Sequence, residues 1–178
     1  MAIHYLKKAD RTPQTGTDET RRIVSDMLTA IESGGEEAAL KYSRDLDGYS
    51  GPALLGRDAI DAAAASVSDQ VKDDIRFAYD RVTSFARAQR ESVNEFEVEL
   101  SPGLWAGQKL IPIETAGCYV PGGRYAHVAS AVMSIATAKV AGVDHIVAAS
   151  APRGEDGPNP AIIYAMHMCG AARLLAMG

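Results

Sequence analysis

The sequence predicts an α/β protein in which N-terminal helices and a β-hairpin precede the first half of a Rossmann-like parallel sheet, truncated after a βαβαβ unit. Two observations predict this class. Apolar residues follow a helical period over most of residues 17–90, and strands alternate with helices after residue 116. Between these regions, a short stretch with a period of two indicates a hairpin.

Four helices are expected in the first part of the chain. Thr17 is a suitable N-cap, and Gly34-Gly35 ends the first helix. A short second helix ends at GYSGP, and a third runs over about residues 57–66. The fourth, residues 68–90, has apolar residues at alternating steps of four and three, which fits either packing on its own domain or a dimer seam. These apolar residues are Val71, Ile75, Ala78, Val82 and Phe85.

The hairpin is predicted from the EFEVEL stretch, which alternates apolar residues with Glu95, Glu97 and Glu99. This alternation predicts a strand buried on one face. Ser101-Pro102-Gly103 predicts the turn, and LWAGQKLIPI the partner strand. The aligned glutamates could suggest carboxylate chemistry, but a solvated strand face is the simpler interpretation.

After residue 116, strands are predicted near residues 116–120, 145–150 and 172–177, with a helix in each gap. This order is the first half of a doubly wound parallel sheet. Because the chain stops at Gly178, at the tip of the third strand, we expect it to be a piece of something longer. The predicted domains are a helical segment plus hairpin, residues 1–112, and a partial Rossmann-like nucleotide-binding domain, residues 113–178.

Composition limits the class of partner. A net charge of −5 argues against a nucleic-acid or anionic membrane surface. Neither a signal peptide nor a run of about 20 apolar residues is present, so we expect a cytoplasmic protein with no membrane partner. Cys118 and Cys169 lie in apolar runs without metal-ligand spacing, which fits buried free thiols in a reducing compartment.

The residues most suited to ligand chemistry follow the first strand of the predicted sheet. Pro121-Gly122-Gly123 turns the chain there, and Arg124 and His127 follow. Ligands of open α/β sheets bind beyond the carboxyl ends of the strands, and helix N-termini favour anions. Arg and His side chains can both donate to an anion. However, G-x-G-x-x-G is absent and the second strand ends in Ala149-Ser150, so a plain tight turn is an open alternative.

GCYVPGG, with Met133 ten residues after Gly123 and then AKVAGVDHIV, resembles the histidinol dehydrogenase family. The resemblance extends to GGEEAALKYSRDLDG, FARAQ, the SPG hairpin and MCGAARLLAMG, so it spans nearly the whole chain. Within that family, IHYLKKA and PGGRYAHVASAVM are most similar to the sulfopropanediol 3-dehydrogenase branch. Histidinol enzymes usually have a small or polar residue in place of Arg124 and no histidine in place of His127.

The resemblance implies a zinc- and NAD-dependent homodimer that oxidises a small primary alcohol through an aldehyde to a carboxylate. The favoured substrate is (R)-2,3-dihydroxypropane-1-sulfonate, oxidised to sulfolactate, and the alternative is L-histidinol, oxidised to L-histidine. The implied NAD-binding residues are Tyr119, Pro121, Gly122 and Gly123. Arg124 and His127 are the expected substrate-binding residues.

In this family the zinc ligands and the Glu-His acid/base pair lie beyond the point where this chain ends. The histidines present, namely His4, His127, His145 and His167, stand at unrelated positions, and a zinc site needs about four ligands. His167 with Cys169 is better explained as part of a buried helix than as a ligand pair. No catalytic or metal residue is therefore predicted here, and this chain alone is expected to be inactive. The alternative of another class is a non-catalytic nucleotide-binding or dimerisation module.

Overall fold

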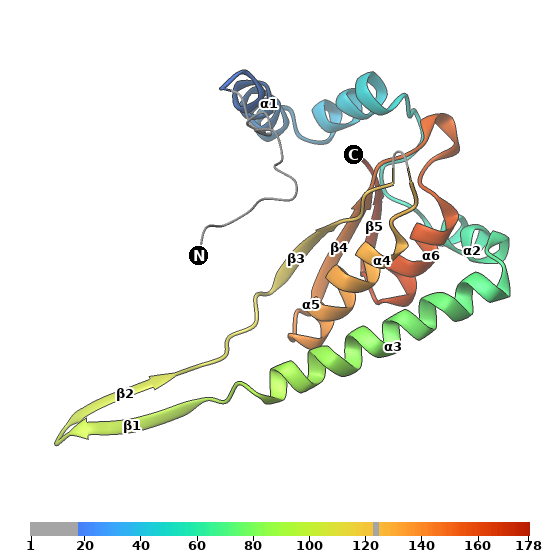
Figure 1. The fold of residues 1–178 in the computed structure, drawn as a ribbon. Coiled ribbons are helices and arrows are strands. Elements are labelled where there is room, and N and C mark those ends of the chain that lie inside the picture. The colour runs from blue at the N-terminus through green and yellow to red at the C-terminus, as the bar shows by residue number, and fades with distance from the viewer. Residues whose placement is uncertain (1–17, 123–124) are drawn as a thin grey trace, which may run out of the picture. The chain divides into compact units, whose positions relative to one another are not determined.

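Four helical segments precede the hairpin, as the sequence predicts, in a computed structural model that describes residues 18–122 and 125–178 (Figure 1). Helix α1 (Asp18–Tyr42) has a break at Gly35, with φ 60° and ψ −141°, at the predicted Gly34-Gly35 stop. A π-helical turn, η1 (Ser43–Asp47), follows and ends at Gly48, which has the left-handed φ of 64° that glycine tolerates. The predicted N-cap Thr17 lies outside the described residues.

By their contacts the residues form two units, Met1–Lys41 and Tyr42–Gly178. The described part of the first unit, residues 18–41, is the α1 helix without its last residue, and no residue of α1 is buried. Every element named below belongs to the second unit. The domain boundary between residues 112 and 113 stays a prediction.

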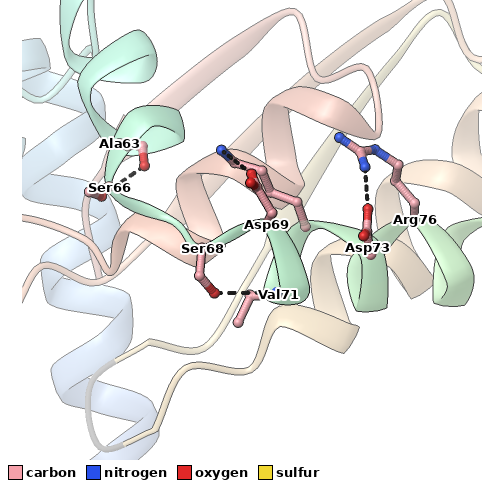
Figure 2. A network of polar contacts seen from close by, with 8 residues as sticks. Ala63, Ser66, Ser68, Asp69, Val71, Asp73 and Arg76 are labelled. Atoms are coloured by element: carbon pink, nitrogen blue, oxygen red, sulfur yellow. Dashed lines mark hydrogen bonds and ion pairs between the residues drawn. The ribbon is translucent and has the colours of Figure 1, made fainter.

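Helices α2 (Arg57–Ser66) and α3 (Asp69–Glu91) meet at two serines. Ser66 Oγ donates to the carbonyl of Ala63 at 2.8 Å, which closes the last turn of α2. Ser68 is the N-cap of α3, and its hydroxyl accepts from the N–H of Val71 at 3.4 Å (Figure 2). The side chains of Ser66 and Ser68 thus define where one helix stops and the next begins.

Helix α3 packs against its own unit through a stripe that includes Ile75, Thr83 and Ala86. This supports the first of the two interpretations of its apolar spacing. The stripe differs from the predicted one, because Phe85 is 67% exposed and Ala86 is buried instead. The buried face of α3 is thus shifted by about one residue from the predicted face. Packing within the unit sets this shift, and the apolar period of the sequence does not resolve it.

The hairpin forms as predicted, from antiparallel strands β1 (Phe96–Ser101) and β2 (Leu104–Gln108). Gly103 makes the turn with a φ of 80°. The prediction of one buried face is wrong for the structure described, since every residue of both strands is exposed. Alternation identified the strand correctly, but nothing described in Tyr42–Gly178 covers its apolar face.

The predicted parallel sheet is confirmed, with β3 (Thr115–Tyr119), β4 (His145–Ser150) and β5 (Arg173–Ala176) in the order β3-β4-β5. Between β3 and β4 the chain forms one helical stretch, and between β4 and β5 a 3-10 turn and a helix. These segments are α4 (Val128–Ala131), η2 (Val132–Ala136), α5 (Thr137–Val140), η3 (Gly154–Asp156) and α6 (Pro160–Met168).

The core lies between one face of this sheet and the helices drawn beside it in Figure 1. Alternate strand residues such as Ile146 and Leu174, together with Val120 just after β3, are buried against helix residues such as Ile135 and Met166. The outer edge of β5 is also covered, by residues 53–55. There the N–H of Leu55 donates to the carbonyl of Leu174 at 2.9 Å.

Candidate ligand site at the carboxyl edge of the sheet

The carboxyl end of β3 and the segment that follows it carry the predicted site. Tyr119 is the last residue of β3 and is 55% exposed. Pro121 is exposed, and its carbonyl accepts the N–H of His127 at 3.3 Å. His127 is the exposed N-cap residue of α4 and makes no capping bond with its side chain. The structure thus brings four predicted residues, Tyr119, Pro121, Gly122 and His127, to one corner, whereas Gly123 and Arg124 lie outside the described residues.

Gly122 is buried at this corner, and its conformation is governed by packing. A Cβ at this position would lie 2.5 Å from Ser150 Oγ and 3.2 Å from the carbonyl oxygen of Ala151. It would also lie 3.3 Å from Ile162 Cδ1 in α6. Glycine is required here because β3, β4 and α6 approach each other closely, so a close approach to a ligand is not needed to explain it.

Arg153 is a member of the corner that the sequence did not single out. Its Nε donates to the carbonyl of Gly122 at 2.9 Å, and its backbone N–H donates to the carbonyl of Gly157 at 2.9 Å. The side chain therefore ties the loop after β4 to the loop after β3. A basic residue soon after the second strand was an available signal, because the carboxyl ends of parallel strands share one edge.

The beginning of α6 also lies against this corner, through Ile162. It is capped internally, since Asn159 Oδ1 accepts from the N–H of Ala161 at 3.0 Å and Pro160 occupies the first turn. Ser150 is fully buried, and among the described residues none forms a hydrogen bond with its Oγ. Its hydroxyl faces the α-carbon of Gly122. The missing hydrogen bond of Ser150 is therefore a consequence of tight packing at this corner.

This arrangement can present one aromatic surface and cationic or neutral donors to a ligand. The Tyr119 ring is open to stacking, while the exposed Arg153 and His127 side chains can donate to an anion. These groups fit a nucleotide with phosphate oxygens. Zinc is a different matter, because in residues 18–122 and 125–178 no group of three or more His, Cys, Asp or Glu side chains could hold a metal ion. Within the same residues, no helix is long and apolar enough to cross a membrane.

Comparison with known proteins identifies the family of this chain. The histidinol dehydrogenase family model matches residues 10–178. The sulfopropanediol 3-dehydrogenase of Ruegeria pomeroyi is 48% identical over 178 residues, which cover 100% of this chain and 41% of the relative. A histidinol dehydrogenase homolog of Pelagibacter ubique is 48% identical over 179 residues. The match covers 100% of this chain and 42% of the homolog.

A solved structure is also similar to this chain. The crystal structure of histidinol dehydrogenase from Elizabethkingia anophelis matches with a TM-score of 0.85 and 26% identity, over 93% of this chain and 38% of the other. The chain belongs to the histidinol dehydrogenase family, a family of dehydrogenases. It spans about two fifths of the length of the relatives named here.

Proposed function

We propose that this chain is the N-terminal part of a zinc- and NAD-dependent dehydrogenase that oxidises (R)-2,3-dihydroxypropane-1-sulfonate through its aldehyde to sulfolactate. One observation carries the choice of substrate. The chain is 48% identical to a sulfopropanediol 3-dehydrogenase and to two proteins named only as histidinol dehydrogenase homologs. It is 33% and 31% identical to the proteins named histidinol dehydrogenase from Methanococcus maripaludis and Methanothermobacter thermautotrophicus. The whole protein would act as a cytoplasmic homodimer.

In this proposal the corner residues bind and orient the cofactor. Tyr119, at 55% exposure, offers its ring to a flat face of NAD. Arg153 Nε donates to the carbonyl of Gly122 at 2.9 Å and so fixes the start of the turn after β3. When bound, NAD supplies the hydride acceptor.

Arg124 and His127 would bind the substrate. A sulfonate is a permanent anion with three acceptor oxygens, which suits a guanidinium fork and an imidazole beside a helix start. The same pair has no favourable charge interaction with histidinol, which is cationic or neutral. The described residues provide no metal cluster, so zinc would have to be held by polypeptide outside them.

The proposal is tested with a chimera in which this chain replaces the matched region of the Ruegeria pomeroyi enzyme, which is 48% identical over all 178 residues. We expect the chimera to reduce NAD with sulfopropanediol at a higher kcat/KM than with histidinol, measured by NADH absorbance. A higher kcat/KM for histidinol would reject the favoured substrate and support the alternative.

Histidinol remains the second candidate because the fold matches a histidinol dehydrogenase at a TM-score of 0.85. A non-catalytic nucleotide-binding or dimerisation module is the alternative of another class. A folded chimera that binds NAD and oxidises neither alcohol would favour that module, with the unmodified Ruegeria enzyme as the positive control.

A further inference from the structure

The loop that follows β4 is a closed turn that carries Arg153 at its start. The backbone N–H of Arg153 donates to the carbonyl of Gly157 at 2.9 Å, and the N–H of Gly157 donates to the carbonyl of Gly154 at 3.4 Å. Gly154 and Gly157 have φ of 57° and 74°, which glycine adopts without strain. These bonds fix the backbone of the turn, and so they fix the point from which the Arg153 side chain extends.

The ring of Tyr49 packs against this turn. Tyr49 is 7% exposed, and its hydroxyl donates to the carbonyl of Pro52 at 3.2 Å. A Cβ added at Gly157 would lie 3.7 Å from Tyr49 Cε2, and one added at Gly51 would lie 2.5 Å from Tyr49 Cζ. Burial raises the pKa of the Tyr49 phenol, and the charge of Glu155 raises it further, so the phenol keeps the proton that it donates. One edge of the ring thus contacts the backbone of both glycines, and the turn after β4 packs on the Tyr49 side chain.

The exposed side chain of Arg153 is anchored at one of its three nitrogens. Its Nε donates to the carbonyl of Gly122 at 2.9 Å, which leaves the N–H groups of Nη1 and Nη2 as further donors. No described residue forms an ion pair with Arg153, although Glu155 and Asp156 belong to the same turn. An anchored arginine loses little side-chain entropy when it binds an anion. Arg153 is therefore preorganised as an anion-binding residue.

The anchored guanidinium lies where an open parallel sheet holds the pyrophosphate of a dinucleotide. In such sheets the pyrophosphate binds at the turn after the first strand. Gly122 belongs to that turn, and the order β3-β4-β5 matches one half of a doubly wound sheet. Tyr119, 55% exposed, and the exposed His127 lie at the same corner. The paired N–H groups of a guanidinium match two oxygens of a phosphate, so a pyrophosphate is the anion that fits this position.

We propose that Arg153 binds the pyrophosphate of the dinucleotide, and that Tyr49 is the positioning residue that holds its loop. Tyr49 acts through the turn, because its ring contacts Gly157, whose carbonyl accepts the N–H of Arg153. Without the ring the turn can move, and the guanidinium then loses its fixed position at Gly122. The inference rests on the proposed dinucleotide site and is independent of which alcohol is oxidised.

Calorimetric titration of the chimera defined above with ADP and with adenosine tests the contact. Arg153→Gln should weaken ADP binding about ten- to a hundredfold and adenosine binding less than about twofold, because only ADP carries the pyrophosphate. Arg173→Gln is the matched control. It removes the same charge from an exposed residue at the start of β5, at the other edge of the sheet, and should leave both affinities unchanged. Equal losses for ADP and adenosine, or no loss for either, would overturn the proposal.

A titration with 2′-AMP separates two sources of the bound phosphate. Strand β4 ends in Ala149-Ser150 and not in the acidic residue that contacts a ribose 2′-hydroxyl, so a 2′-phosphate is the competing source. A pyrophosphate contact predicts that Arg153→Gln leaves 2′-AMP binding unchanged. A loss for 2′-AMP with none for ADP would contradict the proposal, because Arg153 would then contact the 2′-phosphate.

The positioning role of Tyr49 is tested by the same titrations. Tyr49→Leu should weaken ADP binding at least about fivefold and adenosine binding less than about twofold, whereas Tyr49→Phe keeps the ring and should retain most of the ADP affinity. In an Arg153→Gln background, Tyr49→Leu should weaken ADP binding by less than about a further twofold, because no guanidinium is left to position. A lower Tm with an unchanged ADP affinity of the folded Tyr49→Leu protein would mean that Tyr49 only stabilises the fold, and would reject its positioning role.

If Tyr49→Leu does not fold, Gly157→Ala perturbs the same turn, because alanine is strained at a φ of 74°. It should also weaken ADP binding at least about fivefold, and an unchanged affinity would reject the role of the turn. Alcohol oxidation is measured separately. A chimera that binds ADP through Arg153 and oxidises neither alcohol rejects the proposed function and retains this inference. Alcohol oxidation with an ADP affinity that Arg153→Gln does not change retains the function and rejects the inference.

Discussion

Gly122 is placed so that a single methyl group tests the packing of the candidate site. Gly122→Ala should destabilise the protein by about 1–3 kcal/mol, because the new Cβ would lie 2.5 Å from Ser150 Oγ. The free energy of unfolding in urea measures this loss. In a Ser150→Ala background the loss should be smaller, since the nearest clashing atom and a buried hydroxyl without a described partner are both removed.

The control for this substitution is Gly117→Ala in the same segment, where a Cβ would meet no atom within 4 Å. It should change the free energy of unfolding by less than about 0.5 kcal/mol. Losses of the same size at Gly117 and Gly122 would contradict the packing explanation and would indicate a general intolerance of this strand to alanine.

Cys169 gives the protein a distinct response to alkaline pH. The thiol is 2% exposed, and burial raises its pKa from 9.0 to about 12. The unfolded chain therefore loses this proton first, and the stability gained from the neutral buried thiol is present below pH 9 and lost as pH rises toward 12. Relative to Cys169→Ala, the free energy of unfolding should fall by up to about 1.4 kcal/mol per pH unit in this window.

Urea unfolding of both proteins at several pH values isolates the contribution of this thiol, because the remaining titrating groups are shared. Parallel pH profiles would show that Cys169 ionises alike in the folded and unfolded states, which would contradict its burial.

Arg124 is expected to discriminate between the two candidate substrates. Charge-assisted hydrogen bonds contribute roughly 1.5–3 kcal/mol each. In the chimera, Arg124→Ser should reduce kcat/KM for sulfopropanediol about ten- to a hundredfold, mostly through a higher KM. The loss should shrink for an uncharged diol. Equal losses for charged and uncharged substrates would mean that Arg124 does not contact the sulfonate.

Substitutions in helix α3 distinguish its two predicted roles, which are packing against its own unit and forming a dimer seam. Ile75 is 5% exposed against its own unit, whereas Phe85, also on the predicted apolar face, is 67% exposed. Ile75→Ala should cost about 2–5 kcal/mol, and Phe85→Ala less than about 0.5 kcal/mol. Thermal unfolding at two protein concentrations checks both values. A larger, concentration-dependent loss for Phe85→Ala would support a dimer seam.

Local signals predicted the elements well because the causes were local. Ser68 caps α3, and the break in α1 falls at Gly35. The exposed apolar face of β1 could not be predicted, since alternation reports which side chains share a face and not what covers it. The same limit explains why Phe85 was assigned to the buried side of α3.

At the scale of the whole molecule, the β3-β4-β5 order follows from the alternation of strands and helices and the handedness of their connections. The site is different, because its tightest contacts join distant positions. Arg153 bonds to the carbonyl of Gly122 across 31 residues, and Ser150 lies against the same glycine. A sequence pattern predicts that both loops share an edge, but it does not identify which side chains meet there.

The purified 178-residue chain should bind no stoichiometric zinc and should not reduce NAD with sulfopropanediol or histidinol. A catalytic zinc site needs three protein ligands and an open position, and residues 18–122 and 125–178 bring no three candidate side chains together. Metal analysis after dialysis, with the intact Ruegeria enzyme as the control, measures zinc content. One tightly held zinc per chain would mean that His4, the one histidine among the remaining residues, completes a site, and zinc would then belong to this segment.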